Sequence, residues 1–113
     1  MDAEKIKQIA VDALDDMKGK DISCLEVSGI TTIADYMIVV TGTSSRHVKS
    51  MANEVVIKIK EAGGSVFGTE GQSQSEWVLI DLGDVIVHVM LEETRKLYDL
   101  ESLWGMTPGT KNS

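Results

Sequence analysis

The stretch WVLIDLGDVIVHVMLEETRKLYDLESLW, residues 77–104, decides the fold of this 113-residue chain. Residues 77–82 and 84–91 carry apolar side chains at both alternating sets of positions, a pattern typical of strands that are covered on both faces. Gly83 lies between them and predicts a tight turn, and therefore an antiparallel hairpin. A helix is expected next, with one face formed by Leu97, Leu100, Leu103 and Trp104. The block is thus either the centre of the fold or a docking surface.

The rest of the chain predicts the order helix, strand, strand, helix, strand before this block. The patterns indicate a helix over residues 2–18, strands over 21–27 and 35–41, a helix between candidate N-caps at 43–45 and glycines at 63–64, a strand over 65–68 and an exposed loop over 69–76. A strand–helix–strand unit favours a parallel crossover, whereas the last hairpin is antiparallel. The expected fold class is therefore α/β, a mixed five-stranded sheet flanked by helices.

Length and composition predict the number of domains, the cellular compartment and the lack of membrane attachment. The chain is expected to form one domain over residues 1–104, followed by a disordered tail over 105–113 that has no periodic pattern. The single cysteine, Cys24, lies in an apolar run and predicts a buried thiol in a reducing compartment. The charged, amphipathic N-terminus and the lack of an apolar run of ~20 residues predict a cytoplasmic protein without membrane attachment.

The formal net charge of −7 arises from 18 acidic and 11 basic residues, and the basic residues are spread as pairs rather than gathered in a patch. Such a surface repels phosphate backbones, so little or no direct nucleic-acid binding is expected. As a binding partner, a basic protein matches this acidic surface better than a nucleic acid does.

Three sets of residues suggest chemistry, and each has a structural alternative. Residues 42–45 could hold a phosphate at a helix start, but they are more typical of a glycine turn followed by a serine N-cap. Asp81 and Asp84 flank the predicted turn, where aspartate is common, so they do not indicate a metal site. His88 lies inside a strand and is expected to be a hydrogen-bonded histidine in or near the core. No complete catalytic set or cofactor site is visible.

Aromatic residues point instead to binding. Three of the five aromatics, Trp77, Tyr98 and Trp104, lie in the block formed by residues 77–104. Trp77 follows a polar loop at the start of a strand, where it either contacts a partner or covers the end of the core. Tyr98 falls about one helical step of ~100° off the apolar face of the last helix, so it is expected near the rim.

Three blocks, DYMIVVTGTSSRHVKSMA, EWVLIDLGDVIVHVM and RKLYDLESLW, resemble the ribosomal silencing factor (Iojap-like) family, in the same order and through Trp104. The resemblance implies a nucleotidyltransferase-like α/β fold and a homodimer that is not an enzyme and needs no cofactor. It also implies binding to the large ribosomal subunit through the protein that is fourteenth in the usual naming. Binding there blocks association with the small subunit and represses translation under nutrient limitation. Alternatives are a nucleotide-binding enzyme that uses residues 42–45, or a large-subunit assembly factor.

Carried onto this sequence, the resemblance implies a ribosome-facing surface built on the hairpin and the last helix. The implied partner-binding residues are Trp77, Leu79, Asp81, Met90 and Tyr98. Arg95 matches a family arginine whose alternative role is to orient acids within the protein, and the off-stripe Ile57 is a candidate for a dimer contact. Many members carry proline after the tryptophan, where this chain has Val78.

Overall fold

The computed structural model describes residues 1–103, which form a five-stranded sheet with helices on both faces. The strands are β1 (Lys20–Glu26), β2 (Tyr36–Gly42), β3 (Gly68–Glu70), β4 (Trp77–Asp81) and β5 (Val85–Leu91). Their order across the sheet is β1-β2-β5-β4-β3; β2 and β5 are parallel, and the other neighbouring pairs are antiparallel. The expected mixed α/β sheet with an antiparallel final hairpin is confirmed, and its parallel neighbours are β2 and β5 at the centre of the sheet.

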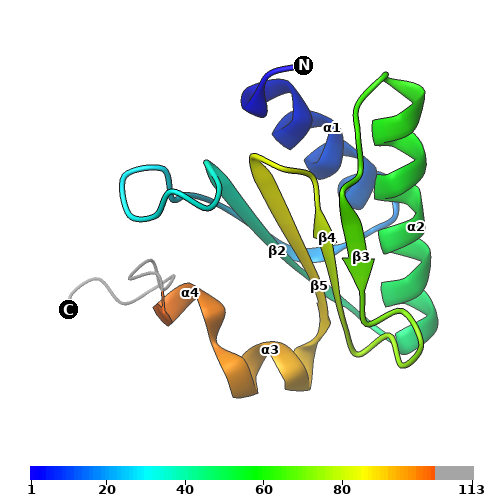
Figure 1. Cartoon of the computed structure of the whole chain (residues 1–113). Coiled ribbons are helices and arrows are strands. Elements are labelled where there is room, and N and C mark those ends of the chain that lie inside the picture. The colour runs from blue at the N-terminus through cyan, green and yellow to red at the C-terminus, as the bar shows by residue number, and fades with distance from the viewer. Residues whose placement is uncertain (104–113) are drawn as a thin grey trace.

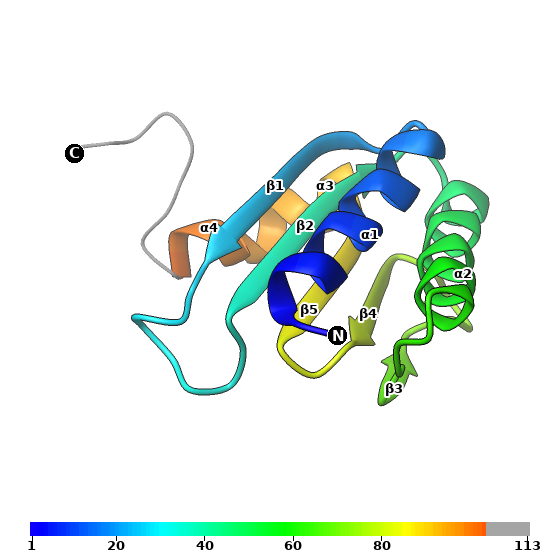
Figure 2. The same cartoon turned by 90° about the horizontal axis from the view of Figure 1, so that it is seen from above.

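Two long helices cover one face of the sheet, α1 (Ala3–Asp16) and α2 (Ser45–Glu61) (Figure 1). Each begins at a side-chain cap, because the Asp2 carboxylate accepts from the Lys5 amide and the Ser44 hydroxyl accepts from the His47 amide. The two helices lie side by side over the sheet when it is seen from above (Figure 2). Their buried residues, which include Leu14 and Met51, pack with the sheet into the larger of two cores.

Alternation along the hairpin assigns its residues to two faces. Val78 and Ile80 of β4, and Val85, Val87 and Val89 of β5, are fully buried against α1 and α2, as the strand pattern predicted. The intervening residues point to the opposite face, where α3 (Glu92–Tyr98) and α4 (Leu100–Leu103) lie. A smaller core forms there from Leu25, Val27, Met37, Val39 and Met90, with Trp77 and Leu100 packed against it.

The last helix differs from the prediction because it is broken. Asp99 adopts a left-handed conformation with φ 45°, which ends α3 and redirects the chain into α4. Leu97, expected on the packed face, is 77% exposed. Trp104 and the predicted tail lie outside the described residues.

Two further expectations are wrong in detail. The third strand begins at Gly68 rather than at residue 65, because it pairs with β4 only from Gly68 opposite Asp81 to Glu70 opposite Leu79. Cys24 is exposed rather than buried, since it lies on the edge strand β1, beyond full cover by α1. Within residues 1–103, no helix is long and apolar enough to cross a membrane.

Candidate partner-binding face

The sheet face opposite α1 and α2 is only partly covered. We call its accessible part the open face, and define it by Trp77, Leu79 and Asp81 of β4, Ile86 of β5 and Tyr98 of α3. His88 of β5 lies on the same sheet face but is only 8% exposed. The β4 residues and Ile86 are half-buried, whereas Tyr98 is 54% exposed. Alternation along β4 and β5 brings these side chains to the same face, with Leu79 directly opposite His88.

Trp77 is the centre of an aromatic row on the open face. Its indole nitrogen Nε1 donates a hydrogen bond of 3.0 Å to Nδ1 of His88. The centroid of the Tyr98 ring lies 4.7 Å from that of the Trp77 indole, and the two ring planes meet at an angle of 47°. This tilted geometry is a favourable one for aromatic pairs. The row therefore fixes the orientation of a large apolar side chain and leaves one flank to solvent.

His88 is a neutral acceptor in this row. Burial lowers the pKa of the His88 imidazole to about 4, because charging the ring would require removing a cation from water. Since the indole donates to Nδ1, the ring proton of the neutral form is on Nε2. The expected hydrogen-bonded histidine near the core is confirmed.

Met90 does not belong to the accessible surface. It lies on the predicted sheet face, opposite Trp77 in the β4–β5 register, but it is fully buried in the smaller core. The expectation that Met90 faces outward is wrong, because strand alternation gives the face of a residue and not what covers it. Trp77 and Leu100 pack against this core, so Met90 supports the open face from below.

An apolar hollow of about 350 Å³ lies on the open face, lined by Leu79 and by His88, the hydrogen-bond partner of Trp77. It extends from Leu79, Ile86 and His88 to the loop between β1 and β2, and its lining also includes Ile33 and Leu100. Asp81 lies at this hollow, and its carboxylate accepts a hydrogen bond from the Gly83 amide in the hairpin turn. The hollow is suited to an apolar side chain of a partner, with a carboxylate close by for a basic group.

Sequence reasoning missed Ile86 and Ile33 as parts of this surface, and His88 as the buried acceptor that holds Trp77. His88 and Ile86 share a strand face with Met90, so alternation alone was enough to place them there. Ile33 lies on an irregular loop, where no periodic pattern exists to reveal it.

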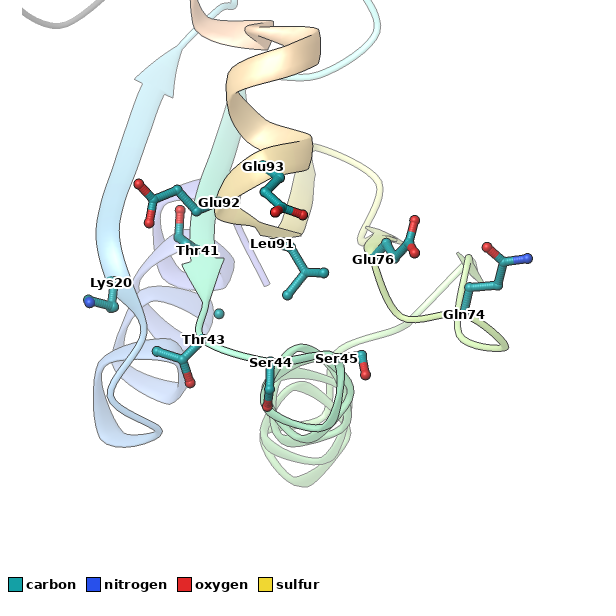
Figure 3. A pocket seen from close by; sticks show the side chains of 11 residues that line it. Lys20, Thr41, Thr43, Ser44, Ser45, Gln74, Glu76, Leu91, Glu92 and Glu93 are labelled. Atoms are coloured by element: carbon teal, nitrogen blue, oxygen red, sulfur yellow. The ribbon is translucent and has the colours of Figure 1, made fainter.

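The turn between β2 and α2, the candidate phosphate site, opens into a second hollow of about 510 Å³. Its capping groups are already used: Ser44 caps α2, and the Thr43 amide donates to Nδ1 of His47. His47 is half-buried, and its Nε2 donates to the Met17 carbonyl at 2.7 Å. Figure 3 shows three carboxylates around the same hollow, those of Glu76, Glu92 and Glu93. Lys20 also lines this hollow, but the three carboxylates outnumber its single positive charge and disfavour a phosphate.

Comparisons with known proteins agree over the full length. A family model described as "Ribosomal silencing factor during starvation" matches residues 1–113. "Ribosomal silencing factor RsfS" of Chromobacterium violaceum is 51% identical over 105 residues, which cover 93% of this chain and 86% of that protein. The Bacillus subtilis protein of the same name is 41% identical over 108 residues, which cover 96% and 92% of the two chains.

Solved structures and more distant relatives extend this result. A Chromobacterium violaceum crystal structure superposes with a TM-score of 0.92 at 50% identity and covers 100% of this chain and 92% of that chain. The mouse protein "Mitochondrial assembly of ribosomal large subunit protein 1" is 33% identical over 88 residues, which cover 75% of this chain and 39% of that protein. The nucleotidyltransferase-like description of the fold stays a prediction. The chain belongs to the ribosomal silencing factor family.

Proposed function

We propose that this protein binds the large ribosomal subunit with its open face, in the cytoplasm, and acts as a silencing factor without catalysing a reaction. Occupying the subunit-joining surface would sterically block association with the small subunit and repress translation under nutrient limitation. The observation that carries the proposal is the Trp77–Tyr98 pair, which holds an aromatic surface open to solvent on a chain of this family. Rigid, partly exposed aromatics are the residues that most often dominate binding energy.

The proposed contact is the large-subunit protein that is fourteenth in the usual naming. Trp77 and Leu79 would supply apolar contact, and Tyr98 would extend it along α3. Asp81 would meet a basic group, in agreement with the net charge of −7 and the basic character expected of a ribosomal partner. Met90 would act indirectly, as the buried support of Trp77.

We further propose a homodimer. Ile57 on α2 is 48% exposed, lies off the helix face that packs on the sheet, and is away from the open face, so both surfaces could be used at once. Sedimentation equilibrium of the wild-type protein and of Ile57→Asp tests this assignment: dissociation of a dimer by the variant supports it, and an unchanged dimer removes Ile57 from the interface.

Binding is tested by cosedimentation of Trp77→Ala with purified large subunits. The expected loss is ~2 kcal/mol or more, about 30-fold in affinity, because the indole is the proposed anchor. Phe67→Ala is the matched control, since Phe67 is a 69% exposed aromatic near the hairpin turn, at the other end of β4. Equal affinities of wild type and Trp77→Ala would remove Trp77 from the site.

Silencing itself is tested by adding the protein to large subunits before small subunits and following their association by light scattering. We expect the wild-type protein and Phe67→Ala to inhibit association and Trp77→Ala to inhibit it weakly. Binding without inhibition would contradict the steric mechanism.

A role in large-subunit assembly is the second candidate, favoured by the name of the mouse relative. Cells that lack the protein would then accumulate immature large subunits, which sucrose gradients detect during growth in rich medium. The nucleotide-binding alternative is tested by calorimetric titration of ATP or GTP with magnesium. Saturable micromolar binding would support it, despite the carboxylates at the β2–α2 hollow.

A further inference from the structure

Helix α3 carries Tyr98, but apart from the contact of Tyr98 with Trp77 its apolar residues do not pack on the sheet. None of its seven residues is buried, and Leu97 is directed to solvent. A helix this short is not stable by itself in water. Some other contact must therefore fix α3 on the sheet and set Tyr98 beside Trp77.

Arg95 supplies that contact with all three nitrogens of its guanidinium group. Nε and Nη2 donate to the two carboxylate oxygens of Glu101 at 3.2 and 2.8 Å, which joins α3 to α4. Nη1 donates to the Asp21 carbonyl of β1 at 2.7 Å and to the Thr41 hydroxyl of β2 at 2.9 Å. One side chain thus joins two strands and two helices.

We propose that Arg95 is the positioning residue of the open face: it seats α3 and α4 on the sheet and thereby sets Tyr98 against Trp77. This inference rests on the proposed function, in which these two aromatics contact the large subunit. The Asp99 amide donates to the Arg95 carbonyl at 2.8 Å, so the same residue also anchors the turn between the helices.

The geometry requires arginine rather than any cation. The planar fork reaches a carboxylate with two parallel hydrogen bonds while its third nitrogen faces the sheet, which the single ammonium of lysine cannot reproduce. Glu101 is only 5% exposed, and the Arg95–Glu101 pair is shielded from water. An exposed pair on the same helix, Lys96–Glu92 at 3.1 Å, lacks that burial and provides a natural comparison.

The test compares Arg95→Lys with Lys96→Ala, which removes only the exposed pair. Two quantities are measured in folded protein well below the unfolding temperature: the NMR shifts of the Tyr98 ring, which the nearby Trp77 ring displaces, and the affinity for large subunits. We expect Arg95→Lys to move the Tyr98 signals toward random-coil values and to weaken binding roughly fivefold, because binding must then order α3 itself. Lys96→Ala should change neither quantity.

A milder variant, Thr41→Val, keeps the test decisive if Arg95→Lys does not fold. It is nearly isosteric and removes one link of Arg95 to the sheet, so smaller changes in the same direction are expected. If these variants lower only the unfolding temperature, with Tyr98 shifts and affinity unchanged, Arg95 has a stabilising role alone and the inference is overturned. Shifted Tyr98 signals with unchanged affinity would overturn it as well.

Failure of the inference is distinguishable from failure of the proposed function. If Trp77→Ala binds as tightly as wild type, the open face is not the ribosome contact, whatever Arg95 does. If Trp77→Ala binds weakly while Arg95→Lys binds normally, the proposed function stands and the positioning role falls.

Discussion

The neutral His88 makes the stability of this protein depend on pH, and the size of the effect follows from its burial. In the folded protein its pKa is about 4, whereas the unfolded chain has the ordinary value of 6.5. Between these values the unfolded chain binds a proton that the folded protein does not. Above about pH 6.5 His88 is neutral in both states and does not lower the free energy of unfolding. As the pH falls from 6.5 toward 4, proton binding by the unfolded chain lowers that free energy.

The expected magnitude is large for a domain of this size. With 1.36 kcal/mol per pKa unit, lowering the pH from 7 to 4.5 should remove about 2.5 kcal/mol through His88. Domains of this kind have a total stability of about 5–15 kcal/mol, so the loss is readily measured. Urea unfolding at half-unit steps from pH 7 to 4.5 gives the free energy of unfolding at each pH.

His88→Gln is the variant that isolates the effect. Its side-chain carbonyl can still accept from the Trp77 indole, but it has no proton to gain. Acidic groups contribute to both proteins; the pKa of Glu4, for example, is lowered by its hydrogen bonds with Lys7 and Tyr36. We expect the wild-type stability to fall by about 2.5 kcal/mol more than that of the variant between pH 7 and pH 4.5, so the difference between the two curves grows toward acid. Parallel curves across this range would refute the assignment of a buried neutral imidazole.

Two further predictions concern the support of the open face. Met90→Ala should lower the free energy of unfolding in urea by about 2–5 kcal/mol, because it leaves a cavity under Trp77. The exposed control Leu97→Ala should change it by less than about 0.5 kcal/mol. Equal effects of the two variants would contradict the burial of Met90. Gly71→Ala should cost more than about 1 kcal/mol, because φ is 92° there and a β-carbon would clash with the Trp77 carbonyl oxygen. Gly29→Ala, which has open space, is its control, and similar unfolding midpoints for the two variants would count against this interpretation.

The sequence predicted correctly the face of the sheet on which each strand residue lies, but not which of these residues are buried by the last helices. Period-two alternation assigned Val85 and Val87 to the core because each strand residue has only two possible directions. The same rule placed Met90 and Trp77 on one face, yet one is fully buried and the other half-buried. The difference is made by α3 and α4, whose position depends on the left-handed Asp99.

Long-range polar contacts were also beyond the reach of a sequence pattern. Arg95 and Asp21 are 74 residues apart, and no local spacing indicates that one guanidinium joins them. Cys24 illustrates the same limit, because an apolar neighbourhood predicts burial only when the strand is not at the edge of its sheet.

The aromatic row explains how one tryptophan could serve both the fold and the proposed docking surface. The polar atom of the indole is satisfied within the chain by His88, so a partner that covers Trp77 does not have to supply an acceptor for it. The indole ring contacts both the His88 and the Tyr98 rings, which lowers the entropy lost when a partner binds. A partner would then have to recognise only the apolar surface beside the Asp81 carboxylate. Partner selection on this face should therefore depend on shape and charge, while the hydrogen bond of the indole maintains the fold.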